Sequence, residues 1–309
     1  MADDTSRTGA GQGLPYVPLP AGLRDPRLQA RAVFDGIAEH YDAARPGYPA
    51  EAIGDLVERC DIGPASHVLE VGCGTGQATR DLARTGAAIH CVERGADLAK
   101  LARRNLAAAA NVSITTTTFE ALAEAPGQYD AIVSATAFHW IDPRVSFAKA
   151  FRLLRPGGSL GLLTNAHGAG GTHAQQPLAD AIRDLHRRFA PEVGSWTFPS
   201  ADDLRARSEA GGDIAQVWAR LERKLADPPS VSGLFDPPVV SVYPWLATYD
   251  RPGYLAMLAT HSSYALLEPG RRRRLLDGIG DLIDQQLGGT VTKQYVTVLA
   301  TAKRRSSRR

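Results

Sequence analysis

Short apolar runs alternate with longer amphipathic stretches through the middle of this 309-residue chain. Between the runs, apolar residues recur at intervals of three and four, as Leu98, Leu101, Ala102 and Leu106 do, which predicts helices with one buried face. Five runs have the length and composition of buried strands: residues 67–71, 88–92, 112–117, 129–134 and 159–163. Strands and helices that alternate at this pace predict crossover connections, and therefore a parallel sheet covered on both faces.

The flanking regions are less regular. Further helices are expected at about 28–42, 47–60, 177–189, 201–225, 251–264 and 271–287, and further strands at 239–248 and 291–300. We expect a disordered N-terminal segment over 1–25, one domain over 26–303 and a basic tail over 304–309. Within the domain we expect a core over 60–165, a cap insertion over about 166–236, and C-terminal strands and helices over 237–303. The helices before the core and the insertion are the natural place for a substrate pocket.

The strongest chemical signal lies at residues 68–77, Val-Leu-Glu-Val-Gly-Cys-Gly-Thr-Gly-Gln, where a buried strand runs into three alternating glycines. Glycine suits a turn that needs unusual backbone angles, and it lets a ligand approach the backbone closely. The dinucleotide fingerprint has its third glycine three residues after the second; here that place is Gln77, and the glycine stands one residue early, at Gly76. With the carboxylate of Glu70 facing the ligand's polar end, the loop favours a cofactor without phosphates over a purely structural turn.

A second acidic residue, Glu93, closes the next strand 23 positions after Glu70. In nucleotide-binding folds, a carboxylate at this position accepts hydrogen bonds from the ribose hydroxyls. The alternative is a solvated glutamate at a helix start, where the helix dipole favours acids. Because Glu93 follows the glycine loop, we assign it to the ribose.

Four blocks in this order resemble the class I S-adenosylmethionine-dependent methyltransferases: residues 68–77, 92–93, 128–133 and the Leu-Leu-Arg-Pro-Gly-Gly-Ser-Leu of 153–160. A narrower resemblance, to small-molecule methyltransferases related to trans-aconitate methyltransferase, rests on residues 41–49, 118–120 and 137–143. The resemblance implies a doubly wound α/β fold, with a seven-stranded, mostly parallel, Rossmann-like sheet whose last strand is antiparallel. It also implies S-adenosyl-L-methionine as methyl donor, without a metal.

The resemblance assigns roles to individual residues. Gly72, Gly74 and Gly76 would cradle the methionine and ribose parts, Glu93 would hold the ribose with Arg94 beside it, and Ala135 would pass beside the cofactor. The adenine would be flanked by Thr118, Phe119 and Glu120. The family often has an acid and a small residue at the first two of these adenine positions, so we expect packing by Phe119 in place of an acidic contact.

The catalytic chemistry has one candidate base, His139, which follows the fourth strand where ligands of open α/β sheets bind. An imidazole can take a proton at neutral pH, although His139 could instead line the pocket or pack between Phe138 and Trp140. Tyr41 and Arg45 lie four residues apart and share a helix face. Tyr41 would close over the sulfonium and Arg45 would pair with a carboxylate; the alternative is a packing role beside the following Pro-Gly turn.

Composition narrows the functional class only slightly. The chain has 35 Lys and Arg against 33 Asp and Glu, which gives no evidence for a nucleic-acid partner. Three cysteines without metal-ligand spacing fit a reducing cytoplasm. We see no secretion signal and no apolar stretch near the ~20 residues that span a bilayer. We therefore expect a cytoplasmic protein without membrane contact, as a monomer or homodimer.

Three rival functions remain. A nucleic-acid base methyltransferase would carry an Asn/Asp-Pro-Pro-aromatic tetrad where residues 137–140 read Ala-Phe-His-Trp. A nicotinamide-dependent dehydrogenase conflicts with the early Gly76. A non-catalytic relative that binds the cofactor or a partner stays open. Our leading hypothesis is methyl transfer to a small molecule, at the oxygen of a carboxylate or hydroxyl, with nitrogen or carbon as alternative acceptors.

Overall fold

The structure, a computed structural model, describes residues 42, 44–167, 176–191, 199–222 and 229–306. The segment expected to be disordered, the helix expected at 28–42 except Asp42, and Tyr41 lie outside the described residues. The chain divides into two compact units. The sheet unit comprises Pro46–Gln176, Trp196–Tyr249 and Thr292–Arg309. The helical unit comprises Met1–Arg45, Pro177–Ser195 and Asp250–Val291.

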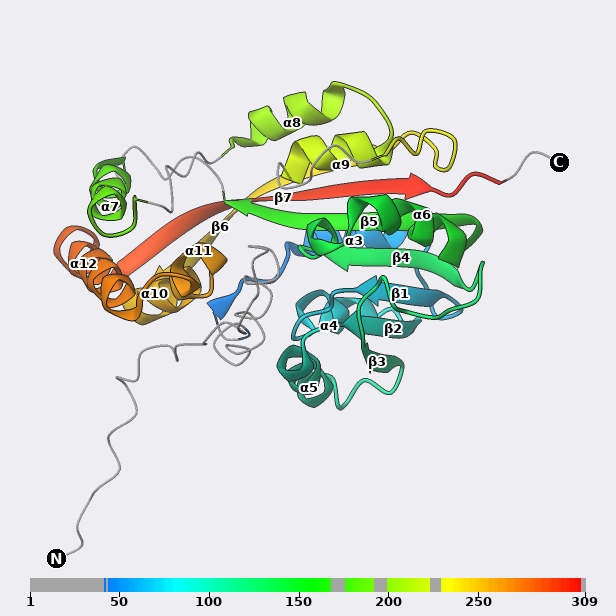
Figure 1. Cartoon of the computed structure of the whole chain (residues 1–309), viewed down its shortest axis with the longest axis horizontal. Helices are drawn as coiled ribbons and strands as arrows, with labels where there is room; N and C mark the ends of the chain where they lie inside the picture. The colour runs from blue at the N-terminus through cyan, green and yellow to red at the C-terminus, as the bar shows by residue number, and fades with distance from the viewer. Residues whose placement is uncertain (1–41, 43, 168–175, 192–198, 223–228, 307–309) are drawn as a thin grey trace, which may run out of the picture. The chain divides into compact units, whose positions relative to one another are not determined.

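Seven strands form one sheet in the order β3-β2-β1-β4-β5-β7-β6 (Figure 1). In chain order they are β1 (His67–Val71), β2 (Ala88–Glu93), β3 (Val112–Thr116), β4 (Tyr129–Ala135), β5 (Leu154–His167), β6 (Val239–Asp250) and β7 (Thr290–Lys303). The pairs from β3 to β5 are parallel, whereas β7 runs antiparallel to β5. The predicted seven-stranded, mostly parallel sheet with an antiparallel last strand is confirmed.

Helices cover both faces of this sheet because successive strand residues point to opposite sides. In β4, Ala131 and Val133 join the cluster formed with α3, α4 and α5, whereas Ile132 joins the cluster formed with α6, α8 and α9. The bounds are α3 (Ala50–Arg59), α4 (Gln77–Ala83), α5 (Ala96–Asn105), α6 (Pro143–Leu153), α8 (Ala201–Glu209) and α9 (Ile214–Glu222). The strand pattern therefore reads as a nearly continuous apolar run, as parallel sheets require.

Strand β5 begins earlier than the apolar pattern suggested, directly after α6. Helix α6 begins at Pro143, with Asp142 as its cap accepting a hydrogen bond from Arg144 N at 2.9 Å. Strand β5 begins at residue 154 rather than 159, and its register with β4 jumps across the intervening Arg-Pro-Gly-Gly. A Cβ on Gly158 would lie 2.8 Å from the Asp130 carbonyl oxygen, so this bulge needs glycine there.

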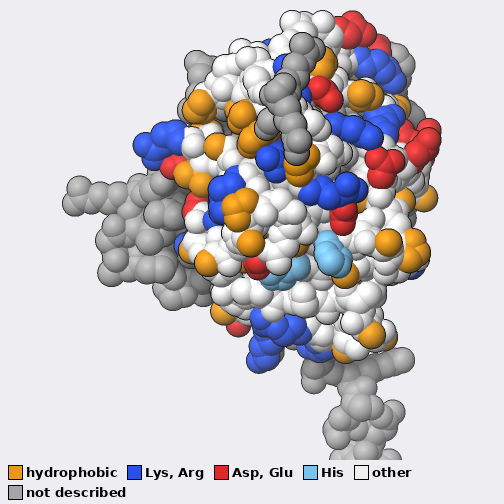
Figure 2. Space-filling view, turned by 90° about the vertical axis from the view of Figure 1, so that its right-hand side faces the viewer, with side chains coloured by type: hydrophobic (Ala, Val, Ile, Leu, Met, Phe, Trp, Pro, Cys, Tyr) orange, Lys and Arg blue, Asp and Glu red, His pale blue; other side chains and the backbone are white. Residues whose placement is uncertain are grey.

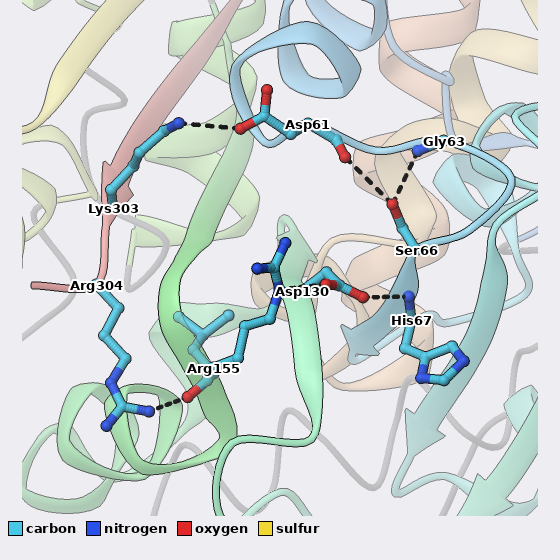
Figure 3. A network of polar contacts seen from close by, with 9 residues as sticks. Asp61, Gly63, Ser66, His67, Asp130, Arg155, Lys303 and Arg304 are labelled. Carbon is cyan, nitrogen blue, oxygen red and sulfur yellow. Dashed lines mark hydrogen bonds and ion pairs between the residues drawn. The ribbon is translucent and has the colours of Figure 1, made fainter. Parts of the chain in front are cut away.

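The amino ends of the parallel strands are closed by a polar network (Figure 3). Asp130 accepts the backbone N–H of His67 at 2.7 Å and pairs with Arg155. Lys303, at the end of β7, donates to Asp61 Oδ2 at 2.9 Å. On the face turned to the right in Figure 1, basic and acidic side chains are interspersed (Figure 2), as on an ordinary solvated surface.

The helical unit contains α10 (Arg251–Ala259), α11 (Ser262–Ala265) and α12 (Pro269–Leu287). It also contains α7 (Gln176–Phe189) except for its first residue. A Cβ on Gly278 of α12 would lie 3.2 Å from a methyl of Leu185 in α7, so the two helices pack closely. The helix expected over 251–264 is interrupted at Thr260 and His261. Among the described residues, no helix has both the length and the apolar character needed to cross a membrane.

Candidate active site

The glycine loop connects β1 to α4 at the carboxyl ends of the strands. Gly72 has φ +73°, and a Cβ there would lie 2.4 Å from the Cβ of Ala137. Gly76 caps α4 in the left-handed conformation, and its Cβ would lie 2.9 Å from Leu106 Cδ1. The first and third glycines are thus required by the protein's own packing. Gly74 has open space, with Gln77 Oε1 as the nearest atom at 3.7 Å, and is the glycine that a ligand can approach.

Glu93, the last residue of β2, is held against this loop. Its Oε2 accepts the N–H of Gly74 at 2.9 Å, and its Oε1 accepts the N–H of Gly95 at 2.8 Å. The residue is only 8% exposed. The carboxylate is thus oriented by backbone N–H groups of the loop and of the residues that follow β2, and its contact with a ribose stays a prediction. Arg94, the next residue, is exposed.

Glu70 is the most unusual polar group at this edge. Its side chain is fully buried in β1, and its Oε1 has no hydrogen-bond partner among the described residues. Desolvation by burial raises the pKa of Glu70 to about 7, while contacts with Thr79 and Cys91 oppose the shift. Buried polar atoms are almost always hydrogen-bonded, so an unpaired carboxylate oxygen needs an explanation.

The expected adenine residues follow β3. Thr118 Oγ1 accepts the N–H of Ala121 at 3.1 Å, which closes a short turn. Phe119 is 3% exposed and lies in the core, with Lys149 Nζ 5.4 Å from its ring centroid. Glu120 Oε1 accepts the N–H of Asp142 at 3.2 Å. The structure therefore places Phe119 with the core; its contact with adenine stays a prediction.

The turn after β4 approaches the glycine loop through Ala137. Ala135 ends the strand in register with Leu163. Between the two alanines, Thr136 has φ +55°. This conformation is strained for a β-branched residue, by about 1–3 kcal/mol, and persists only where surrounding contacts hold it. Here the Thr136 hydroxyl is hydrogen-bonded to Tyr48 OH at 2.8 Å and accepts the N–H of Asn165 at 3.3 Å.

His139 lies on the short helix η1 (Phe138–Trp140) that follows this turn. Its side chain is 3% exposed, and its Nδ1 lies 3.4 Å from Oε2 of Glu222, whose side chain is 5% exposed. The imidazole also lies 5.0 Å from the Trp140 ring, between centroids. The structure thus places the candidate base in a buried pair with an acid from α9.

The remaining predicted residues lie in the helical unit. Arg45 donates from Nε to Thr260 Oγ1 at 3.1 Å and from Nη2 to the Thr260 carbonyl at 3.2 Å. These bonds suit the packing alternative for Arg45, while its contact with a cofactor carboxylate stays a prediction. Tyr41 lies outside the described residues. Among the side chains described, no group of three or more His, Cys, Asp or Glu is arranged to hold a metal ion.

Two residues of this edge, Thr136 and Glu222, were absent from the predicted site. Nothing in the sequence marks Thr136, because a threonine after a strand is common. Glu222 does carry a signal: it lies four residues after Trp218, a fully buried residue of α9, and therefore on the same inward face. An acid on the apolar face of an amphipathic helix is a buried charge that needs a partner.

The strand order and the helices on both faces of the sheet define a Rossmann-like fold. Residues 68–158 match a protein family described as methyltransferase domain. An uncharacterized methyltransferase of Mycobacterium tuberculosis is 34% identical over 132 residues, covering 43% of this chain and 51% of that protein. A ubiquinone biosynthesis O-methyltransferase of Xanthomonas campestris is 34% identical over 131 residues, covering 40% of this chain and 55% of that one.

The fold is also found in a crystal structure of a putative type II methyltransferase from Anaeromyxobacter dehalogenans. It is 22% identical, with a TM-score of 0.50, and the match covers 84% of this chain and 97% of that one. Residues 68–158, which hold the glycine loop and Glu93, are therefore similar to the methyltransferase domain of that family. The chain spans about half the length of the curated relatives that it matches.

Proposed function

We propose that the protein binds S-adenosylmethionine at the glycine loop and transfers its methyl group to a small-molecule acceptor. The observation that carries the proposal is that two carboxylates lie at the carboxyl edge of the sheet. One is oriented by backbone N–H groups, and the other has a buried oxygen to which the described residues donate no hydrogen bond. Glu93 is fixed by the N–H groups of Gly74 and Gly95, while the buried Oε1 of Glu70 has no partner in the part of the chain that the structure describes. Both suit a nucleoside attached to an amino acid rather than to phosphates.

The two carboxylates have different tasks in this proposal. Glu93 accepts hydrogen bonds from the ribose hydroxyls, and Glu70 faces the ammonium of the methionine part. An ammonium there supplies the partner that Glu70 lacks and neutralises a carboxylate whose ionisation is otherwise opposed by burial. The cofactor supplies a methyl group already activated on a sulfonium. The chain therefore contributes mainly positioning and exclusion of water, which can supply up to about 7–11 kcal/mol of a barrier.

We further propose an oxygen acceptor, a carboxylate or hydroxyl. The Xanthomonas relative is named as an O-methyltransferase, which supports this choice. His139 is the candidate base for a hydroxyl, because it follows β4 at the ligand-binding edge of the sheet. A positioned base typically contributes about 10²–10⁴-fold, and an acceptor that is already ionised does not need one.

Calorimetry tests the cofactor assignment directly. Wild-type protein should bind S-adenosylmethionine and S-adenosylhomocysteine and should not bind NAD. Glu93→Gln should weaken binding by about 10–100-fold, because a hydrogen bond to a charged group is worth about 1.5–3 kcal/mol. Asp130→Asn is the matched control, since Asp130 also holds a backbone N–H but at the opposite edge. Absence of binding by folded wild-type protein would refute the proposal.

Mass spectrometry then tests the transfer itself. Cell extract incubated with the enzyme and isotopically labelled methyl donor should yield at least one labelled small molecule, which identifies the acceptor. Cofactor binding without any labelled product across extracts of several sources would favour a non-catalytic relative. Label on nitrogen or carbon would replace the oxygen assignment and leave the methyltransferase assignment intact.

A further inference from the structure

His139 and Glu222 are far apart in the sequence, but their side chains lie close together in the structure. Nδ1 of His139 lies 3.4 Å from Oε2 of Glu222, and the side chains are 3% and 5% exposed. The described residues give Nδ1 no hydrogen bond. The acid is therefore close to this ring nitrogen, as a charged neighbour rather than as a hydrogen-bond partner.

The sequence neighbours of both partners belong to the same buried hydrophobic cluster. Phe138, beside the histidine, is 1% exposed and packs edge-on against Phe147 with centroids 5.0 Å apart. Trp218 and Leu221, beside the acid, belong to that cluster too. A pair held by packed neighbours on both sides has little freedom to move to another partner.

The helix that carries the acid is also anchored at its start. Oδ1 of Asp213 accepts the N–H groups of Ala215 and Gln216, each at 3.0 Å. Oδ2 of Asp213 accepts from Ser230 Oγ and from Val231 N, both at 2.8 Å. Helix α9 is thus tied to the segment that follows it, and Glu222 is presented at a defined place.

A buried acid beside an imidazole has a definite chemical consequence. The carboxylate favours a proton on the near nitrogen, Nδ1, which leaves Nε2 with its lone pair for an outside proton. It also stabilises the imidazolium that forms when Nε2 accepts that proton, and it does so in surroundings with little water. An acid placed in this way sets the tautomer of the ring.

We infer that Glu222 is a positioning residue, supplied by the insertion, that holds His139 in the tautomer able to accept the acceptor's proton; this inference rests on the proposed function. In the transfer, the acceptor oxygen forms the new bond to the methyl carbon. The bond from carbon to sulfur breaks with its electrons left on sulfur, and the hydroxyl proton moves to Nε2 of His139. The insertion thereby completes the catalytic edge rather than only covering it.

Ring spectroscopy tests the inference without any acceptor. The chain has 8 histidines, so ¹⁵N-histidine-labelled full-length protein gives few ring signals, and His139→Gln identifies the relevant pair. Wild-type protein should show a protonated Nδ1 and a bare Nε2 at neutral pH. Glu222→Gln should show both nitrogens sharing the proton, while the exposed control Glu209→Gln keeps the wild-type pattern. An unchanged ring pattern in Glu222→Gln overturns the inference.

Kinetics and binding separate this role from a structural one. With an acceptor found by mass spectrometry, Glu222→Gln should lower kcat by about 10–100-fold, less than the ~10²–10⁴-fold contribution of a positioned base, because His139 itself is retained. The acceptor KM and the Kd for S-adenosylhomocysteine should stay within about threefold, because the substitution keeps the size of the side chain and leaves the glycine loop unaltered. Equal loss in kcat and in cofactor affinity would assign Glu222 to structure alone.

A folding failure is also decisive. If Glu222→Gln unfolds but Glu222→Asp stays folded with the wild-type ring pattern and measurable transfer, the charge at this place is required and the inference holds. If both variants unfold, the pair is a structural clamp and the inference fails. If folded wild-type protein does not bind S-adenosylhomocysteine, the proposed function fails. Calorimetry on the wild-type protein detects this outcome separately from the ring spectra.

Discussion

Acidic side chains at the amino and carboxyl ends of the parallel strands differ in their hydrogen bonding. At the amino edge, Asp130 divides its oxygens between the His67 N–H and Arg155. At the carboxyl edge, three residues after His67 in β1, Glu70 is fully buried, and its Oε1 has no hydrogen bond to any described residue. Asp130 at the amino edge is used within the fold, whereas Glu70 at the carboxyl edge has one oxygen that the described residues leave unused. Unused capacity in a buried place marks where a ligand belongs.

Backbone strain follows the same division. Thr136 holds φ +55° at the carboxyl end of β4. At the other edge, the positive φ values near the network fall on glycines such as Gly157, apart from Asp61, a residue type that tolerates this region better than threonine does. Strained residues gather at functional sites because the surrounding contacts are there to hold them. Substitutions at the two edges should therefore have unequal effects on stability and on cofactor binding.

The largest effect is expected from Gly72→Ala. The added Cβ would meet Ala137 at 2.4 Å, on a backbone with φ +73°. Left-handed strain and overpacking together should lower the free energy of unfolding by about 2–5 kcal/mol, and binding of S-adenosylhomocysteine should be lost. Chemical denaturation and calorimetry measure the two effects. Gly63→Ala is the control, because a Cβ there meets nothing within 4 Å; equal effects at both glycines would contradict the packing argument.

A smaller effect, opposite in sign, is expected from Glu70→Gln. Burial raises the pKa of Glu70 from 4.5 to about 7, so the folded state holds this proton more tightly than the unfolded chain. The resulting destabilisation begins as pH rises past 4.5 and is complete above about 7. At 1.36 kcal/mol per unit, removing it should stabilise the ligand-free protein at pH 8 by up to about 3 kcal/mol.

The same variant should lose affinity for the cofactor. Binding of an ammonium beside Glu70 favours the ionised carboxylate, so wild-type affinity should rise with pH through about 7 and binding should release a proton. Calorimetry in buffers of different ionisation enthalpy detects that release. Glu70→Gln should bind weakly without this pH dependence, and the exposed Glu58→Gln should behave as wild type. A pH-independent wild-type affinity would remove Glu70 from the cofactor site.

Much of this contrast between edges could be predicted from the sequence. The apolar runs locate β1 to β4 within one or two residues, because buried parallel strands leave an unbroken apolar signal. Gly72 and Glu93 could be named because a tight loop and a strand-end acid are local features. The start of β5 could not, since the pattern does not show that Leu154 pairs with Tyr129 across a bulge.

The residues that were missed depend on contacts between distant segments. The pairing of Glu222 with His139 follows from how α9 packs on the sheet, and no spacing in the sequence encodes that geometry. Thr136 is strained only because Tyr48 and Asn165 hold its hydroxyl. The core position of Phe119 also depends on tertiary packing, and its contact with adenine stays a prediction. Local patterns specify elements; tertiary packing decides which side chains face a ligand.

The smallest effect is expected at the amino edge, from Lys303→Met. The ion pair of Lys303 with Asp61 spans 2.9 Å, but the two side chains are 52% and 68% exposed. Exposed pairs contribute about 0.2–1 kcal/mol, and salt screens them. Urea unfolding should therefore show a loss in that range at low salt and less at 1 M salt, with an unchanged Kd for S-adenosylhomocysteine. A clear loss of cofactor affinity would mean that the two edges are coupled, and the contrast between them would no longer locate the site.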